Sequence, residues 1–517
     1  MICSIILPNQ LFDNPLLYHL SDNIYLIEDD KFFIDLPYHK QKLILHRASM
    51  KAYYDYLLNL EDSNKKNIIY IDSKKALTIY DKLFKQYNII HIYDPEDIQI
   101  EKKFNKLKKK YSNIIEIHHN QLFIETKDEL ETYYQSLKSH TRYTHDASFY
   151  RWQRIRLNIL IDNDDKPEFG KWSFDHDNRK PFDKNYIQHQ IKDPKPNNSE
   201  YVQEAKIYVE KNWPDNFGLT DNFFYPVNFE QAKSLFKSFL KYKISSFGKY
   251  EDAVNTDIPF GSHSLLSSSL NIGLIHPKYV LTKILNAYSK LSDINKKKAI
   301  PNVEAFIRQL IGWRSYGRFI YTYHGEQMYN ENALSHHNKI TDDWYTGTTQ
   351  IYPIDHIIKK VERYAYAHHI ERLMYLGNYA LLMQIDPIEI YNWFMICFID
   401  SYEWVMIPNV MGMSQYSSKT VKMMTRPYFS SSNYIKGLSN YKLNSYDEIE
   451  LQGNKVTGQE SYYWNEIWDA LYYNFINRNY NLLKKIYAVA RNVVHWDKKS
   501  INEQNKLLKI AKYWLQY

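Results

Sequence analysis

Cysteine is nearly absent from this 517-residue sequence. Only Cys3 and Cys397 occur, which excludes a disulfide framework and leaves too few thiolates for a cysteine-ligated zinc or iron–sulfur site. This composition is typical of a reducing compartment. We therefore expect a cytoplasmic protein.

Long hydrophobic runs are also missing. A membrane-spanning helix requires a run of about 18 apolar residues, and the sequence contains no such run. Residues 1–7 lack the charged region and the long apolar stretch of a signal peptide. The sequence predicts a protein that neither spans a membrane nor is secreted by that route.

The glycine-rich phosphate loop of dinucleotide-binding domains is absent as well. Pro8-Asn9-Gln10 follows the first predicted strand, where that loop would stand. Excess charge is small, because 66 basic and 59 acidic residues give +7. This charge permits DNA binding without demanding it.

The chain is too long for one hydrophobic core, so we expect several domains. Residues 1–130 alternate helical stretches, such as 40–60 and 74–86, with short apolar, β-branched runs at 4–7, 23–27, 67–71, 88–93 and 114–117. This alternation predicts an α/β domain with a doubly wound, Rossmann-like parallel sheet. The lysine-rich run 102–110 is predicted to be a solvated helix face rather than a DNA contact.

Residues 131–204 are predicted to be a linker, because 160–200 is polar and rich in Pro, Asp, Asn and Lys. Lys171, Trp172 and Arg179 interleave basic and aromatic side chains there. They are candidates for DNA contact, and the alternative is a loop that merely connects.

Residues 205–517 are predicted to be an all-α domain. Apolar residues recur at spacings of three and four in 229–242, 279–291, 303–323, 354–382, 387–404 and 464–477. No convincing strand pattern is found in this part of the sequence.

Three segments of the helical part carry candidate site residues. Residues 261–267 combine a histidine with several serines at a helix start, which predicts a phosphate site or, alternatively, a serine-rich helix cap. Arg308, Gln309 and Trp313 lie within little more than one turn. Gln309 and Trp313 share a face, where an aromatic ring with a polar neighbour could stack on a base; the alternative is a core Trp with a solvated Gln.

The third segment, residues 366–374, is the most informative. His368 and His369 are about 100° apart on a helix, so they cannot face the same way. His369 shares its stripe with Arg372, so that both would face one ligand; the alternative is a structural histidine. Together with Asp400, these residues can hold a large flat redox cofactor and move a proton, which points to a flavin enzyme. No metal site is predicted, since no second ligand lies at the spacing of a known motif.

Five segments together resemble the cryptochrome/photolyase family, and within it the branch of bacterial (6-4) photolyases that carry an iron–sulfur cluster. The segments occur in the family's order and span nearly the whole chain: Trp213-Pro214-Asp215-Asn216-Phe217-Gly218, His263-Ser264-Leu265-Leu266-Ser267, Phe306 to Arg314, Ala365-Tyr366-Ala367-His368-His369 and Tyr402 to Gln415.

The resemblance implies an amino-terminal antenna domain, a linker and a helical domain that binds FAD. It implies that Arg372 and Asp400 form the ion pair beside the flavin ring, and that Met406 faces flavin N5. It assigns the remaining FAD contacts to His263, Ser264, Leu265, Ser267, Arg308, Gln309, Asn378 and Asn409. The resemblance also implies a possible antenna chromophore of the ribolumazine type in the amino-terminal domain.

The resemblance also assigns the reaction. His369 stands where (6-4) enzymes have their catalytic histidine and where cyclobutane-dimer enzymes have Asn. Its further candidates are His368 and Tyr428 for catalysis, Trp393, Trp404 and Tyr434 for electron transfer, and Trp313, Arg179 and Lys171 for DNA contact.

The sequence departs from the family at several positions. Where cluster-bearing relatives have four cysteines, this chain has Pro353, Lys442, Ser445 and Ser461, so no iron–sulfur cluster is expected. Ser315 replaces an acidic residue, which blurs the expected substrate contacts. Phe394 follows Trp393 where relatives often have Tyr, which weakens the case for electron transfer through Trp393.

The predicted function is light-driven repair of (6-4) photoproducts in double-stranded DNA by a monomeric, FAD-dependent DNA photolyase, with His369 as proton donor. Two other functions stay open: a cryptochrome-type blue-light photoreceptor without repair, and a cyclobutane pyrimidine dimer photolyase. A third possibility is a structural all-α protein without a cofactor.

Overall fold

A parallel sheet forms the amino-terminal part of the chain. The computed structural model describes residues 1–143, 148–188, 193–443 and 462–516. The strands are β1 (Ile2–Ile6), β2 (Asn23–Ile27), β3 (Asn67–Ile71), β4 (Ile89–Tyr93) and β5 (Ile114–His118). Their order is β3-β2-β1-β4-β5, and all pairs are parallel. The predicted doubly wound sheet is confirmed.

The sheet is wound outward from β1 in both directions, which requires a crossover between successive strands. The helices of this part are α1 (Leu16–Leu20), α2 (Asp30–Phe33), α3 (Lys40–Leu58), α4 (Ser73–Gln86) and α5 (Ile98–Tyr111). Some lysines of α5 form ion pairs within the protein: Lys102 pairs with Glu326, and Lys110 lies 2.8 Å from Asp81.

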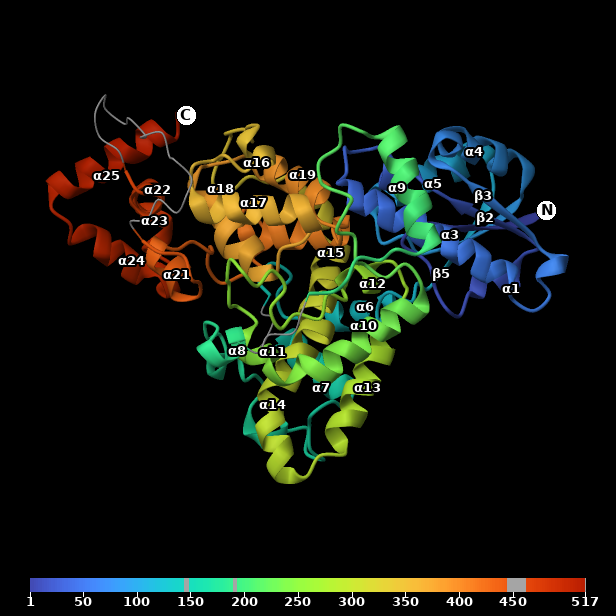
Figure 1. Ribbon diagram of the computed structural model, residues 1–517, viewed down its shortest axis with the longest axis horizontal. Helices are drawn as coiled ribbons and strands as arrows, with labels where there is room; N and C mark the ends of the chain where they lie inside the picture. Colours follow the sequence, from blue (N-terminus) through green and yellow to red (C-terminus); the bar gives the residue numbers. More distant parts are fainter. Residues whose placement is uncertain (144–147, 189–192, 444–461, 517) are drawn as a thin grey trace.

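The chain then crosses to the helical part and returns. This stretch contains α6 (Lys127–Ser136), α7 (Tyr150–Arg156), α8 (Lys184–Gln188) and α9 (Glu200–Asn212). Helix α9 lies along α3 beside the sheet (Figure 1). Arg47 of α3 is 2.6 Å from the Glu204 carboxylate and 3.9 Å from the Tyr208 ring centroid. Helix α9 spans residue 204, so the domain boundary predicted there falls within a helix. Both predicted domain boundaries stay predictions.

The rest of the described chain is helical, as predicted, and contains no strand. It comprises α10 (Phe229–Tyr242), α11 (Phe247–Tyr250), α12 (Ser267–Asn271), α13 (Pro277–Ser289), α14 (Asp293–Ile307), α15 (Arg314–Tyr329), α16 (Asp343–Thr346), α17 (Tyr352–Tyr364), α18 (Asn378–Leu382), α19 (Pro387–Cys397), α20 (Glu403–Met406), α21 (Ser432–Gly437), α22 (Trp464–Arg478), α23 (Tyr480–Leu483), α24 (Tyr487–Asp497) and α25 (Ile501–Trp514). In Figure 1, α15 to α19 lie between the sheet and the carboxyl-terminal helices α21 to α25.

The predicted single helix 354–382 is wrong. Helix α17 ends at Tyr364, Ala365 has a left-handed backbone with φ +50°, and residues 366–368 are not helical. The break is held by hydrogen bonds that a helix cannot make: the backbone N–H of His368 donates to Glu371 Oε2 at 2.9 Å, and that of Ile399 donates to the Ala365 carbonyl O at 3.0 Å. His369 therefore opens the next helix instead of lying within one.

The predicted helix 387–404 is also interrupted. Helix α19 ends at Cys397, and the next helix begins at Glu403. The hydroxyl of Ser401 donates to the carbonyl O atoms of Met395 and Phe398, at 2.9 Å and 2.7 Å, and so folds the chain back. Asp400 lies in this loop rather than on a helix face.

Candidate functional site

An ion pair between two interrupted helical regions lies at the centre of the site. Arg372 Nη1 donates to Asp400 Oδ1 at 2.8 Å, and Nη2 donates to Oδ2 at 3.2 Å. Arg372 Nε donates to the Ala367 carbonyl O at 2.7 Å, and the guanidinium lies 4.0 Å from the Phe398 ring centroid. Four contacts thus hold the guanidinium in one orientation.

The Asp400 carboxyl stays ionised in this environment. Burial raises its pKa, but the charge and hydrogen bonds of Arg372 and a hydrogen bond from Ser267 more than offset burial, so that the pKa lies below its usual value. The side chains of Arg372 and Asp400 remain 13% and 10% exposed. A ligand can therefore reach the edge of the pair.

The predicted phosphate segment is tied to this ion pair. Ser267 begins α12, and Asn271 at its end donates from Nδ2 to the Asp400 carbonyl O at 2.9 Å. The hydroxyls of Ser268 and Ser269 are buried and bond to no residue that the structure describes. Because an unpaired buried hydroxyl is costly, these oxygens fit the polar groups of a ligand.

His263 and His368 form a stacked pair with ring centroids 4.7 Å apart and planes 15° apart. Burial lowers the pKa of each far below its usual value, and nearby positive groups lower it further. Both imidazoles are therefore neutral. Ser264 and Leu265 connect this pair to α12, and Leu265 takes a left-handed conformation with φ +59° that turns the chain toward the helix.

His369 differs from its neighbour in exposure. His368 is buried, whereas His369 is exposed. The pKa of His369 is lowered to about 4, first by desolvation and then by the charges of Arg372 and Arg179. The imidazole is therefore neutral at pH 7 in the protein alone, and its proton uptake depends on added negative charge.

The predicted linker brings a DNA-contact candidate to this histidine. Arg179 has φ +65°, and its guanidinium lies 2.5 Å from the Asp175 carboxylate and 3.3 Å from that of Asp252. Its charge acts on both His369 and Tyr434. Lys171, by contrast, places its Nζ 5.4 Å from the Phe174 ring centroid.

Arg179, Arg426 and Tyr428 all lie close enough to Tyr434 to affect its pKa. Burial and Asp252 raise the pKa of Tyr434 to about 12, with smaller effects from Arg179, Arg426 and Tyr428. The guanidinium of Arg426 lies 5.4 Å from the Tyr428 ring centroid. Cations interleaved with aromatic rings suit nucleic acid. Sequence reasoning missed Arg426, although it stands two positions before Tyr428.

Arg308 pairs with carboxylates of the protein itself. Its guanidinium is buried and lies 3.0 Å from Asp175, 3.3 Å from Glu304 and 3.6 Å from Glu251. Since Asp175 also binds Arg179, Arg308 anchors the segment that carries Arg179. The cofactor contact predicted for Arg308 stays a prediction.

Three π-helical segments carry several of the predicted residues: Arg308–Trp313, Glu371–Gly377 and Ile407–Ser414. A π turn shifts a helix by one residue and is frequent at functional sites. Gln309 and Trp313 are half-buried in the first segment, and Arg372 lies in the second. No pattern in the sequence predicted these turns.

Three further predicted residues lie on or beside these segments. Met406 is buried directly before the third, and Asn409 within it donates from Nδ2 to the Val405 carbonyl O at 2.8 Å. Asn378, just after the second, is fully buried and donates to Ser430 Oγ at 2.9 Å. The structure thus gives both amides a partner within the protein.

The two tryptophans predicted for electron transfer, Trp393 and Trp404, have different neighbours. Trp404 packs edge-on against Phe123 at 4.7 Å, with the Arg314 guanidinium 4.7 Å from its ring. Trp393 lies 5.8 Å from Phe398, the ring that contacts Arg372.

Trp393 begins a chain of aromatic side chains toward the carboxyl-terminal helices. Its ring centroid is 5.5 Å from that of Trp344, which is 5.8 Å from Tyr379, which is 5.7 Å from Trp468. Trp393 Nε1 donates to the Trp344 carbonyl O at 3.0 Å. Sequence reasoning identified Trp393 but not the residues that continue from it.

Of the four positions where cluster-bearing relatives have cysteine, Ser445 and Ser461 lie outside the described residues. Pro353 is buried in the first turn of α17, and Lys442 accepts a hydrogen bond at its carbonyl O from Trp464 Nε1 at 3.2 Å. The two cysteines are buried, one in β1 and one at the end of α19.

Comparisons with known proteins identify the family of this chain. Residues 4–225 match the family model described as deoxyribodipyrimidine photo-lyase-related protein. A (6-4) photolyase of Agrobacterium fabrum is 31% identical over 421 residues, which cover 81% of this chain and 78% of that protein. The chain therefore belongs to the cryptochrome/photolyase family.

Solved structures show the same fold. A bacterial class III photolyase from Agrobacterium tumefaciens aligns with a TM-score of 0.53 and 14% identity over 83% of this chain and 82% of that one. A Synechocystis cryptochrome aligns with a TM-score of 0.50 and 11% identity over 98% and 93%. Among the described residues, no helix is both long enough and apolar enough to cross a membrane.

Proposed function

We propose that the chain is a light-driven DNA photolyase that binds FAD at the Arg372–Asp400 pair. The observation that carries the proposal is this oriented, ionised pair with His369 one helical turn from Arg372. Ser268 and Ser269 hold hydroxyls without described partners for the polar groups of the cofactor. When bound and reduced, FAD supplies an electron under blue or near-UV light.

The substrate that we propose is a (6-4) photoproduct flipped out of double-stranded DNA. Reversal of this lesion needs a proton to accompany the electron, and His369 is the exposed imidazole beside the pair. DNA phosphates bound near His369 would raise its pKa from about 4 toward neutrality, because negative charge stabilises the imidazolium. His369 can then donate its proton to the lesion.

We propose that Arg179, Arg426, Tyr428 and Tyr434 form the rim that receives the DNA. The two arginines can pair with phosphates on either side of the lesion, and the tyrosine rings can stack on a flipped base. Flipping costs less for a damaged base, since it is already poorly stacked. Trp313 and Lys171 stay candidates for DNA contact.

The remaining cofactor assignments are proposals as well. A ribolumazine-type antenna would lie in the sheet domain, where α/β folds bind ligands at the carboxyl ends of the strands. An iron–sulfur cluster is not expected, because ligation needs four thiolates and the sequence has two cysteines. Iron well below one atom per chain in the purified protein supports this, and one or more atoms per chain contradicts it.

The deciding experiment follows flavin content and repair together. Heat-released pigment should behave as FAD on chromatography, and Asp400→Asn should retain far less of it than Arg363→Gln, a change at an exposed position of α17. Illuminated protein should then repair an oligonucleotide with a single (6-4) lesion. Repair of cyclobutane dimers alone would assign the other photolyase class, and bound FAD without repair of either lesion would favour a photoreceptor. A colourless protein would overturn the proposal.

A further inference from the structure

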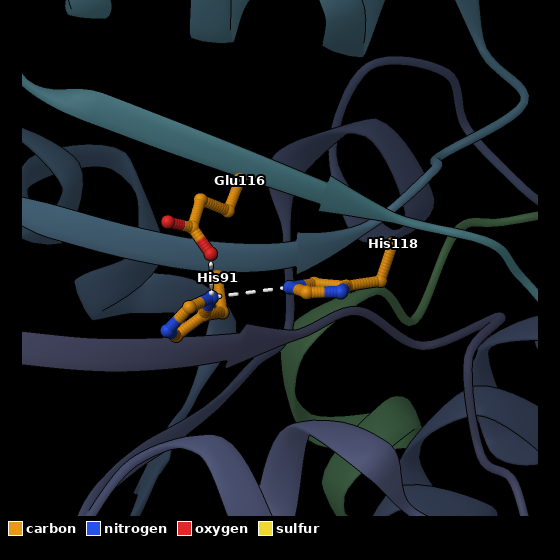
Figure 2. A group of neighbouring side chains, drawn as sticks. All are labelled: His91, Glu116 and His118. Carbon is orange, nitrogen blue, oxygen red and sulfur yellow. Dashed lines mark hydrogen bonds and ion pairs between the residues drawn. The ribbon is translucent and has the colours of Figure 1, made fainter.

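Two imidazoles and one carboxylate meet at the edge of the sheet, far from the Arg372–Asp400 pair in the sequence. His91 lies on β4, and Glu116 and His118 lie on β5 (Figure 2). The register pairs His91 with Glu116 and Tyr93 with His118. Because residues two apart on a strand share a face, all three side chains point to the same side of the sheet.

That side carries α1, since the Leu17 backbone N–H donates to the Tyr93 hydroxyl at 3.3 Å. Helix α1 contacts β1 and β4 and is only five residues long. Glu116 is exposed and His118 is half-buried. The group is therefore open to solvent on its β5 side.

Two distances within the group match those between neighbouring ligands of a small metal ion. His91 Nδ1 lies 3.1 Å from His118 Nε2 and 3.2 Å from Glu116 Oε2. One ligand atom from each residue lies within 4.8 Å of the other two. Ligand bonds of about 2.05 Å in a tetrahedral zinc site place neighbouring ligand atoms about 3.3 Å apart.

Protons alone satisfy this group poorly. His91 Nδ1 makes both close contacts, yet it can carry only one proton. If that proton points at Glu116, none is left on His91 Nδ1 for a separate hydrogen bond to His118 Nε2. If His118 donates instead, the lone pair of His91 Nδ1 faces the Glu116 carboxylate. A cation removes this conflict, because each of the three atoms can offer it a lone pair.

His91 is also unusual for its place in the sheet. It is 6% exposed and stands between Ile90 and Ile92 in an otherwise apolar run. Parallel strands covered on both faces are normally apolar throughout, so a buried imidazole needs a compensating contact. The pairing with the two residues of β5 supplies that contact.

The strand that provides the other two ligands is weakly held. Ile114 and Ile117 of β5 are 56% and 60% exposed, so this edge strand gains little from burial of its own side chains. A metal ion shared between β4 and β5 would add a link at the end of the strand.

We propose that His91, Glu116 and His118 bind one divalent metal ion, Zn²⁺, which links β5 to β4. Two imidazole nitrogens and one carboxylate oxygen are a donor set that zinc accepts, whereas Mg²⁺ and Ca²⁺ prefer oxygen ligands throughout. Three protein ligands leave a fourth position for water. The site is separate from the proposed FAD site and does not depend on the proposed repair function.

The test is a zinc titration of the full chain after removal of metals with a chelator. Isothermal titration calorimetry should show one Zn²⁺ site in the wild type, and His118→Ala and Glu116→Gln should each weaken it at least about 10-fold. His337→Ala, at a histidine side chain that is 74% exposed, should leave the binding unchanged. Mg²⁺ should give no comparable heat. Equal zinc affinity in the wild type and both site variants would overturn the proposal.

Two further readouts distinguish this site from zinc held elsewhere. X-ray absorption at the zinc edge should show imidazole ligands in the wild type, with one fewer in His118→Ala. Zinc should raise the melting temperature of the wild type but not that of His118→Ala, and the flavin spectrum should be the same in both. A zinc-dependent stabilisation that survives in His118→Ala would contradict the role of this site.

Discussion

The Nζ of Lys42 lies 2.8 Å from the Ser401 carbonyl O, so that α3 beside the sheet reaches the loop that carries Asp400. The same Nζ donates to the Met395 carbonyl O at 3.0 Å and to Ser401 Oγ at 3.0 Å. Lys42 is fully enclosed and lies 4.4 Å from the Tyr38 ring centroid. One side chain of the sheet domain thus holds the residue that follows Asp400 in the chain.

Replacing this lysine tests that connection. Lys42→Met keeps the length of the side chain but removes the buried donor to the Ser401 and Met395 carbonyl O atoms, so we expect a loss of about 1–3 kcal/mol in the free energy of unfolding and weaker flavin retention. Urea unfolding and flavin content measure the two effects. Lys40→Met on the same helix removes a surface pair with Glu210 and should cost at most about 1 kcal/mol. Equal effects of the two variants would contradict the prediction.

The contribution of Lys42 should depend on pH. Burial lowers its pKa from 10.5 to about 7, against the opposing charge of Asp400. Between these values the unfolded chain binds more protons than the folded one, so the stability contributed by Lys42 rises as pH increases from about 7 to 10. The stability difference between wild type and Lys42→Met should therefore shift in favour of the wild type over this window. A difference that is constant with pH would show that Lys42 is not neutralised on folding.

The proposed proton donor can be tested directly. His369→Ala should retain FAD and lose about 10²–10⁴-fold in the rate of (6-4) repair, the usual contribution of general acid catalysis. Single-turnover repair under saturating light gives the rate, and the released pigment gives the FAD content. His337→Ala serves as the matched control, because its imidazole is exposed. If His369→Ala repairs normally, His368 becomes the next candidate.

Arg179 should affect the pH at which His369 is protonated. Its charge lowers the pKa of His369, after desolvation and Arg372, so Arg179→Gln should raise the pKa. His369 then stays protonated to higher pH, so the pH at which the repair rate falls should be higher in Arg179→Gln than in the wild type. Saturating DNA in a single-turnover assay separates this shift from weaker binding. An unchanged pH profile would show that Arg179 acts only on DNA binding or on folding.

The aromatic chain predicts a route for light-driven reduction of the flavin. Trp393→Phe and Trp344→Phe should each slow photoreduction in the presence of an external thiol, because both interrupt the series of rings that begins near Phe398. The loss of the oxidised flavin absorption gives the rate. Trp496→Phe removes a buried tryptophan that stacks on Tyr473 instead, and should have no effect. Normal photoreduction in both chain variants would place the route elsewhere.

Much of the fold was predictable because local patterns specify it. Strands at 23–27 and 67–71 and the helix 229–242 lie where predicted, since β-branched runs and apolar spacing agree with the surrounding packing. The predicted helices 354–382 and 387–404 failed at Ala365 and Phe398, where no Gly or Pro marks a break. There the chain is turned by Glu371 and Ser401, through contacts that arise only in the folded structure.

The candidate site was partly predictable for the same reason. Arg372 and Asp400 were paired through the family resemblance, and the structure shows their contact. Arg426 and Trp344 were missed, because their relation to the site depends on segments far apart in the sequence. The group of His91, Glu116 and His118 was missed since strand register, rather than a sequence spacing, brings it together.

The position of α9 determines which fragment of the chain can be expressed alone. Val202, Ala205 and Val209 of α9 are buried where this helix lies along α3. A fragment that stops at residue 130 would leave the matching side of α3 exposed to water, and such an apolar surface favours aggregation. A fragment that continues through 225 keeps the covering helix, and it also coincides with the end of the matched family model. Attempts to isolate the sheet domain, or to exchange it between relatives, should therefore cut after residue 225.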